Sequence, residues 1–152
     1  MIMRSVLAIV LSVSMASAVL AAGSPSTSTP RPPTEYDLGV KAVKAGDYAR
    51  AFSLLQKVVV ANSRDANAWN FIGFSHRKLN RFDQALAAYK KALAIEPNHR
   101  GANEYLGELY LQTGKLQKAK EHLKILDSAC FLGCEKYDDL KAAIASYESR
   151  RK

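Results

Sequence analysis

The stretch Phe71–Ala85, FIGFSHRKLNRFDQA, has two counterparts in this chain of 152 residues. Asp37–Ala51 (DLGVKAVKAGDYARA) aligns with it on the N-terminal side and Tyr105–Ala119 (YLGELYLQTGKLQKA) on the C-terminal side, and the three stretches are evenly spaced. A fixed period of about 34 residues is typical of proteins in which one small structural unit is repeated along the chain. The sequence therefore predicts an array of three similar units.

Each unit reads as a helix, a tight turn and a second helix. Apolar residues recur at helical spacing on both sides of the turn. The turn position holds glycine or asparagine, the residues that best tolerate a left-handed backbone. The aligned sets are Leu38, Ile72 and Leu106; Gly39, Gly73 and Gly107; Gly46, Asn80 and Gly114; and Ala51, Ala85 and Ala119.

The repeated glycine of the first helix predicts close helix packing. Glycine in a helix costs about 1 kcal/mol relative to alanine. Glycine nevertheless recurs at the same position of each repeat, at Gly39, Gly73 and Gly107. This recurrence indicates that a neighbouring helix approaches too closely for a Cβ atom. We expect the aligned alanine of the second helix to supply the matching small surface. One unit cannot bury both of its faces alone, so the units must stack.

The central unit resembles a tetratricopeptide repeat. The residues that carry the resemblance are Trp69, Ile72, Gly73, Ala85, Tyr89, Ala92 and Pro97. The flanking units match less completely, since Ala42 and His76 replace an aromatic residue that only Tyr110 keeps. The resemblance implies an all-α fold, a helix-turn-helix solenoid with repeats at about 32–65, 66–99 and 100–133.

A capping helix is expected at residues 135–149. Tyr137, Leu140, Ile144 and Tyr147 form one apolar stripe there, while Lys141 stands where the repeats have glycine. A last helix with a polar outer face would close the solenoid. The domain is thus predicted to span 35–149, as three repeats plus a C-terminal capping helix.

The segment that precedes Glu35 is expected to lie outside that domain. Residues 1–22 have a single charge at Arg4, an apolar run and small residues at the end, which indicates a secretory signal peptide. The alternative is a short membrane anchor, although the run falls short of the roughly 20 residues a spanning helix needs. Residues 23–34 read as a solvated linker rich in Pro, Ser and Thr. We therefore expect a periplasmic or secreted protein with no transmembrane segment after cleavage.

Cys130 and Cys134, the only two cysteines, are expected to flank the turn into the capping helix. In an oxidising compartment two cysteines this close normally pair. Closing a five-residue loop would stabilise the fold by about 2 kcal/mol in the entropic model. Two alternatives stay open. One is a copper or zinc site with His122 or His99 as a further ligand, and the other is a catalytic redox pair, for which the C-x-x-C spacing is missing.

No catalytic or nucleotide-binding motif occurs, so the chain is predicted to be neither an enzyme nor a cofactor-binding protein. Glu104 and Glu108 lie four residues apart, a pattern that is more often a solvated helix face than an acid–base pair. His76 occupies a packing position. The formal charge of +8 would suggest nucleic acid for a cytosolic protein, but an exported one would meet acidic proteins or anionic envelope surfaces instead.

The resemblance also implies a working surface, because in this family the groove lined by the first helices receives an extended peptide or a partner helix. We place Phe74 at its centre and Arg77 and Lys78 nearer its rim. The carboxylate clamp of some relatives is not expected, since Tyr36 and Val40 take its first-repeat positions. The predicted partner-binding residues are Tyr36, Lys44, Asn67, Asn70, Phe74, Arg77, Lys78, Glu104 and Glu108, with Val40 and Leu111 beside them.

The function predicted from these features is a non-catalytic exported adaptor that binds a protein or peptide. The alternative is a thiol- or metal-handling accessory protein of the cell envelope that uses Cys130 and Cys134.

Overall fold

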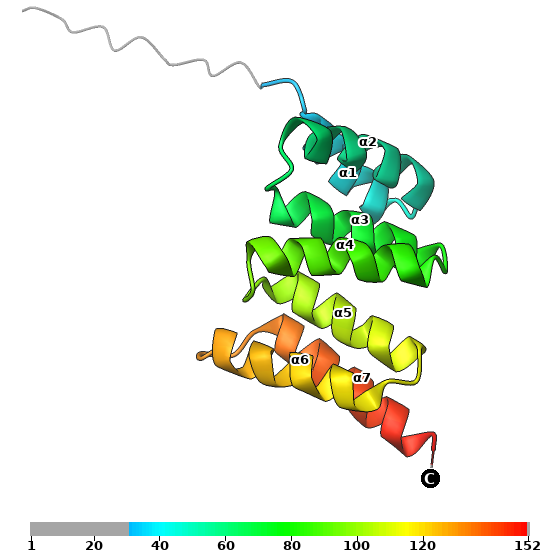
Figure 1. Cartoon of the computed structure of the whole chain (residues 1–152), viewed down its shortest axis with the longest axis vertical. Helices are drawn as coiled ribbons and strands as arrows, with labels where there is room; N and C mark the ends of the chain where they lie inside the picture. Colours follow the sequence, from blue (N-terminus) through cyan, green and yellow to red (C-terminus); the bar gives the residue numbers. More distant parts are fainter. Residues whose placement is uncertain (1–30, 152) are drawn as a thin grey trace, which may run out of the picture. The chain divides into compact units, whose positions relative to one another are not determined.

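The computed structural model describes residues 31–151, and this part of the chain contains helices and no strand. The signal peptide and most of the linker predicted from the sequence lie outside it. The helices stack in chain order (Figure 1). Their bounds are α1 Glu35–Lys44, α2 Tyr48–Ala61, α3 Ala66–Lys78, α4 Phe82–Ile95, α5 Arg100–Gln112, α6 Leu116–Ala129 and α7 Glu135–Ser149. The all-α prediction is confirmed, and α7 has the bounds expected of the capping helix.

The helices begin where side chains can bind their free amide groups. Thr34 and Asp37 form a capping box at the start of α1. The carboxylates of Asp47 and Asp65 accept hydrogen bonds from the backbones of α2 and α3, and the His99 ring does the same for α5. Each cap satisfies an amide group that has no partner within its helix.

The turn inside each repeat has one geometry. Gly46, Asn80 and Gly114 adopt φ values of 76°, 58° and 73°, the left-handed conformation predicted for this position. The next residue donates its backbone N–H to the carbonyl of Ala42, His76 or Tyr110, at 3.0, 2.9 and 2.7 Å. This bond ends the first helix by a C-terminal capping geometry that a left-handed residue permits.

The helical glycines mark close contacts, as predicted, but the matching residue is large rather than small. A Cβ on Gly39 would lie 2.7 Å from the Leu55 side chain, and one on Gly73 would lie 2.6 Å from the Tyr89 ring. The expectation that alanine fills this role is therefore wrong. Ala51, Ala85 and Ala119 are fully buried in the core.

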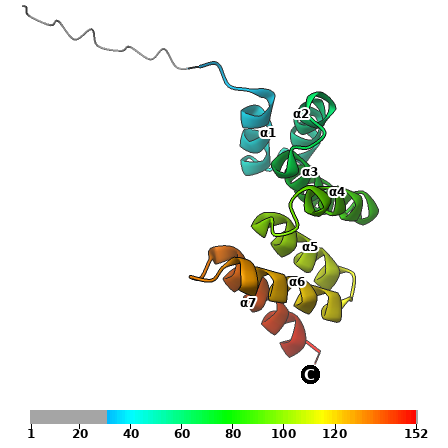
Figure 2. The same ribbon diagram turned by 60° about the vertical axis from the view of Figure 1, so that its left-hand side comes forward.

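In the third repeat, the large side chain that packs against the helical glycine comes from the capping helix. A Cβ on Gly107 would lie 2.6 Å from Leu140 of α7, although Leu123 occupies the aligned position of Leu55 and Tyr89. Helix α7 accordingly packs against both α5 and α6 (Figure 2). Its buried residues are Leu140 and Ile144, from the stripe predicted for it. Lys141, which aligns with the glycine of the repeats, is exposed.

The core runs through the whole stack. One cluster of buried side chains centres on Leu55 in the first half, and another on Tyr89, Leu106 and Leu126 in the second. Trp69 packs against both clusters, so the two halves share one continuous core. Among residues 31–151, no helix combines the length and hydropathy that crossing a bilayer requires.

Candidate functional site

The first-helix face is the surface that α1, α3 and α5 present away from their partner helices. The structure places the predicted binding residues at three depths on this face. Those exposed are Lys44, Asn67 and Lys78; those half-buried are Tyr36, Phe74 and Glu108; and those buried are Asn70, Arg77 and Glu104. Three residues expected at the surface are therefore part of the protein interior.

Phe74 lies at the middle of an aromatic cluster. Its ring centroid is 4.8 Å from that of Tyr105 on α5 and 6.0 Å from that of Tyr48 on α2. The Lys78 ammonium lies 5.3 Å from the same ring, within cation–π range. Phe74 is thus held by its neighbours and contributes to packing between α2, α3 and α5. Tyr105 and Tyr48 were missed in the site prediction, although Tyr48 aligns with the large apolar residues Phe82 and Leu116 in the repeat.

Arg77 was expected near the rim, and that prediction is wrong. Its side chain is 4% exposed, and its Nη2 atom lies 2.6 Å from the Glu108 carboxylate on α5. The guanidinium also lies 5.4 Å from the Phe74 ring and 5.6 Å from the Tyr105 ring. Its Nε atom is buried without a hydrogen-bond partner in the described structure. Arg77 therefore ties α3 to α5 beneath the surface.

Glu104 is buried under the capping helix rather than open to a partner. Its side chain is 3% exposed, and the Lys136 ammonium of α7 lies 3.2 Å from its Oε2 atom. Burial raises the pKa of Glu104 to about 7 and outweighs the opposing attraction of Lys136. Burial lowers the pKa of Lys136, but Glu104, Tyr105 and Glu135 together raise it above its ordinary value. The site prediction missed Lys136 because it came from the repeats alone.

Glu104 and Glu108 are not a solvated pair of carboxylates. Glu104 pairs with Lys136 of α7 and Glu108 pairs with Arg77 of α3, so each carboxylate joins α5 to a different neighbour. Both contacts hold helices together.

Two hollows flank the Phe74 cluster on the first-helix face. One, of about 530 Å³, lies over α1 and is lined by Tyr36, Val40, Lys44 and Phe71 among others. The other, of about 380 Å³, lies between the C-terminal ends of α3, α5 and α7. It is lined by Arg77, Lys78, Glu108, Leu111, Gln112, Ala143, Ser146 and Arg150. Phe71, Gln112 and the residues of α7 were missed in the site prediction.

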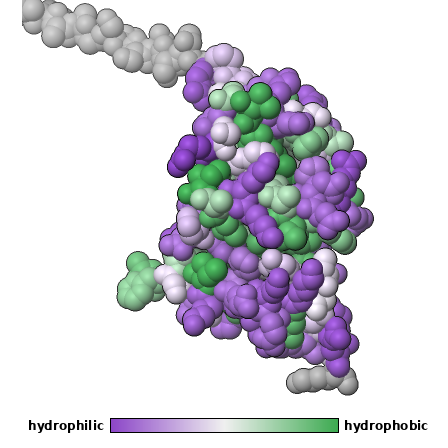
Figure 3. All heavy atoms as spheres, viewed as in Figure 1, coloured by the Kyte–Doolittle hydropathy of each residue, from purple (hydrophilic) through white to green (hydrophobic). Residues whose placement is uncertain are grey.

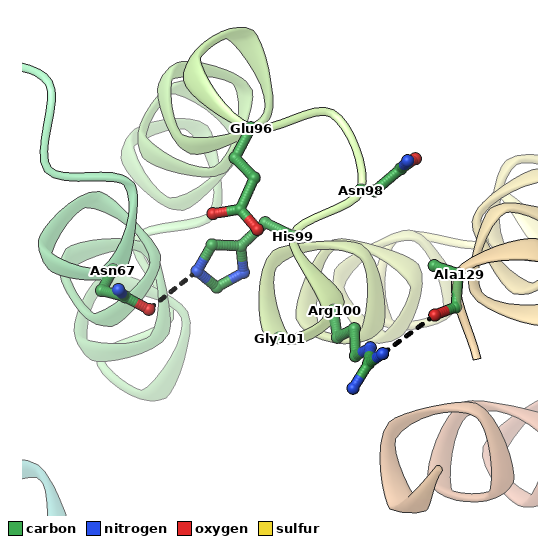
Figure 4. Close-up of a pocket in the computed structure, with 7 residues that line it drawn as sticks. All are labelled: Asn67, Glu96, Asn98, His99, Arg100, Gly101 and Ala129. Carbon is green, nitrogen blue, oxygen red and sulfur yellow. Dashed lines mark hydrogen bonds between the residues drawn. The ribbon is translucent and has the colours of Figure 1, made fainter. Parts of the chain in front are cut away.

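A third hollow lies at the opposite ends of α3 and α5 and is strongly polar (Figure 4). It contains Asn67, whose Oδ1 atom lies 3.0 Å from the Nε2 atom of His99. Because His99 Nδ1 accepts the backbone N–H of Ala102, its Nε2 atom donates to Asn67. On the far side, Arg100 donates to the carbonyl of Ala129. Asn67 thus joins α3 to the start of α5.

The histidines considered as metal ligands make other contacts. His99 bonds Asn67 and Ala102, and His122 Nδ1 lies 2.8 Å from Asn103 Oδ1. The described residues contain no cluster of three His, Cys, Asp or Glu side chains arranged to hold a metal ion. His76 is buried and its ring centroid lies 4.6 Å from that of Phe52, which confirms its predicted packing role.

The two cysteines stand at the ends of the α6–α7 loop, with their sulfur atoms facing each other. The disulfide itself stays a prediction. The loop carries Phe131 and Leu132, which are 91% and 94% exposed. It projects from the body of the domain in the space-filling view, where polar side chains cover most of the visible face (Figure 3).

Comparison with known proteins agrees with this architecture. The family model described as "Tetratricopeptide repeat" matches residues 66–99, the central unit of the array. Residues 66–99 thus match the tetratricopeptide repeat family. One relative, tetratricopeptide repeat protein 37 of Xenopus laevis, is 39% identical over 69 residues, which is 45% of this chain and 4% of the relative. The tetratricopeptide repeat array therefore spans only a small part of that relative's length.

Solved structures share the fold at low sequence identity. The type III secretion chaperone SycD of Yersinia enterocolitica, in complex with a peptide of the translocator YopD, has a TM-score of 0.66 at 16% identity, covering 78% of this chain and 92% of SycD. The second tetratricopeptide repeat domain of human RPAP3, in complex with an HSP70 peptide, has a TM-score of 0.66 at 18% identity, covering 76% and 92%. At these identities the likeness establishes the fold alone.

Proposed function

We propose that this protein is a non-catalytic adaptor whose first-helix face holds a peptide segment or helix of a partner protein. The observation that carries the proposal is the pair of hollows on either side of the Phe74 cluster, on one face of the array. An aromatic side chain between hollows, with cationic neighbours, is the arrangement that anchors peptides in many interfaces. The complexes that SycD and RPAP3 form with peptides support the same use of the fold.

The buried ion pairs favour a preformed surface. Arg77–Glu108 links α3 to α5 and lines the second hollow, and Glu104–Lys136 links α5 to the start of α7. A surface held in place before binding loses less conformational entropy when a ligand arrives. The adaptor thus needs no folding step on binding.

We further propose that the adaptor acts outside the cytoplasm, in the periplasm or beyond it. The support is the signal-like character of residues 1–22 in the sequence. Mass spectrometry of the protein recovered from periplasmic extract tests this, because a mature chain beginning within residues 16–24 would establish cleavage. An intact N-terminus in a protein recovered only from the cytoplasm would refute it.

The binding proposal is tested by fishing for a partner from periplasmic extract with wild-type protein, followed by titration calorimetry. Phe74→Ala should weaken binding by about 2 kcal/mol or more, because central, desolvated aromatics dominate interface energies. Since Phe74 also packs on Tyr105, circular dichroism must first show that the variant folds. Val60→Ala, at an exposed apolar residue on α2, is the matched control and should bind as wild type does. If Phe74→Ala also binds as wild type does, the first-helix face is not the binding surface.

A further inference from the structure

The hollow between the ends of α3, α5 and α7, called here the α7 hollow, carries uncompensated positive charge. It contains three cationic groups, Arg77, Lys78 and Arg150, and one carboxylate, Glu108. Glu108 is already paired with Arg77 at 2.6 Å. Within residues 31–151, neither Lys78 nor Arg150 has a carboxylate at ion-pair distance, although Arg150 donates to Ser146 Oγ at 2.9 Å.

Apolar surface adjoins these cations. Leu111 and Ala143 line the same hollow, and the Lys78 ammonium lies 5.3 Å from the ring centroid of Phe74. A ligand that fills the hollow therefore meets positive charge and apolar side chains at once. Charge complementarity across an interface favours a ligand of opposite sign.

We infer that the α7 hollow receives an aspartate or glutamate side chain that stands next to an apolar residue in a groove-bound peptide. This inference rests on the proposed function and names the chemistry of the segment that the first-helix face would select. The two free cations stand at the C-terminal ends of α3 and α7, two helices that each contact α5. That separation suits acidic side chains in a passing segment, whereas a chain-end carboxylate needs donors that converge on one point.

Selection of random linear peptides displayed on phage provides the test, with the full mature protein as bait. Peptides selected by wild type should be enriched in Asp or Glu beside an apolar residue. The double variant Lys78→Glu with Arg150→Glu should lose that enrichment and select Lys or Arg instead. Lys90→Glu with Lys124→Glu makes the same charge change at exposed positions on α4 and α6, and it should keep the wild-type preference.

Selected acidic peptides are then synthesised, labelled and titrated by fluorescence anisotropy. The Lys78→Glu, Arg150→Glu variant should bind them at least roughly tenfold more weakly than wild type, with a smaller dependence on salt. Peptides with an amidated C-terminus should bind as well as free acids. If amidation abolishes binding, a chain-end carboxylate is the occupant and the inference is wrong. Lys78→Gln with Arg150→Gln repeats the comparison without charge reversal if the first variant fails to fold.

The outcomes separate this inference from the proposed function. Peptides that bind wild type, lose affinity with Phe74→Ala and show no acidic preference would overturn the inference and leave the adaptor proposal standing. An acidic preference that the double variant retains would also overturn it. Failure to select any peptide whose binding depends on Phe74 would overturn both.

Discussion

The Arg77 guanidinium of α3 lies 2.6 Å from the Glu108 carboxylate of α5, and only 4% of the Arg77 side chain is exposed. A charge removed from water in this way needs its partner, because an unpaired buried charge is strongly unfavourable. The pair therefore fixes the spacing of two neighbouring repeats at the centre of the first-helix face. Its contribution can be measured against that of an exposed pair in the same chain.

Glu108→Ala should lower the free energy of unfolding by about 1–3 kcal/mol, because it leaves the Arg77 guanidinium buried without its carboxylate. Urea denaturation followed by circular dichroism measures the loss. The control is Glu35→Ala, which breaks the Lys57–Glu35 pair, whose side chains are 64% and 44% exposed. That change should cost no more than about 1 kcal/mol. Equal losses of unfolding free energy in the two variants would show that the buried pair stabilises the fold no more than the exposed pair does.

Gly73→Ala should destabilise the protein even though alanine is the better helix former. The added Cβ would lie 2.6 Å from the Tyr89 ring, so the α3–α4 contact must open at a cost of about 1–3 kcal/mol. The Gly73→Leu change should cost more. Gly101→Ala is the control, since its Cβ would lie 3.1 Å from Asn70 Nδ2 and 3.5 Å from His99 Cε1, both longer than the contact at Gly73. Thermal unfolding in which Gly73→Ala is at least as stable as wild type would refute close packing at this glycine.

Glu104→Gln should change how stability depends on pH. The folded-state pKa of Glu104 is about 7, raised by burial above its unfolded value, so the folded state holds this proton more tightly. The proton on Glu104 therefore stabilises the folded state. This contribution is fully present below the pKa of Glu104 in the unfolded chain, about 4.3, and is lost as the pH rises towards 7. Glu104→Gln removes that loss, and the variant should gain about 1–3 kcal/mol relative to wild type between about pH 5 and pH 8.

Urea midpoints for wild type and variant across that pH range provide the measurement. Glu96→Gln, at an exposed carboxylate, is the control and should leave the wild-type profile unchanged. Parallel profiles for wild type and Glu104→Gln would show that Glu104 ionises normally in the folded protein.

Cys130 and Cys134 should be oxidised to a disulfide in protein recovered from its native compartment, with no free thiol on titration. Cys130→Ser with Cys134→Ser should lower stability by about 2 kcal/mol at most, since the loop they close has five residues. The change should leave α7 docked, because Leu140 and Ile144 remain buried against the array. Two reactive thiols, or copper retained after mild purification, would favour the thiol- or metal-handling role instead.

The sequence alone was sufficient to predict the elements of this fold. The even spacing of the aligned stretches placed the three helix pairs, and the left-handed turns at Gly46, Asn80 and Gly114 followed from residue type. The bounds of α7 followed from its apolar stripe. These features depend on contacts between residues close in sequence, or on a pattern repeated in each unit, and both can be read without coordinates.

Only the tertiary structure decided which residues of the first-helix face remain available to a partner. Helical phase gives Glu104 and Arg77 the same outward direction as Phe74, yet Glu104 lies beneath α7 and Arg77 lies beneath two aromatic rings. The burial of Glu104 depends on how closely α7 approaches α5, where Leu140 packs against Gly107, and the burial of Arg77 depends on how closely α5 approaches α3. Such contacts join residues far apart in the chain, and a single sequence carries no periodic signal for them.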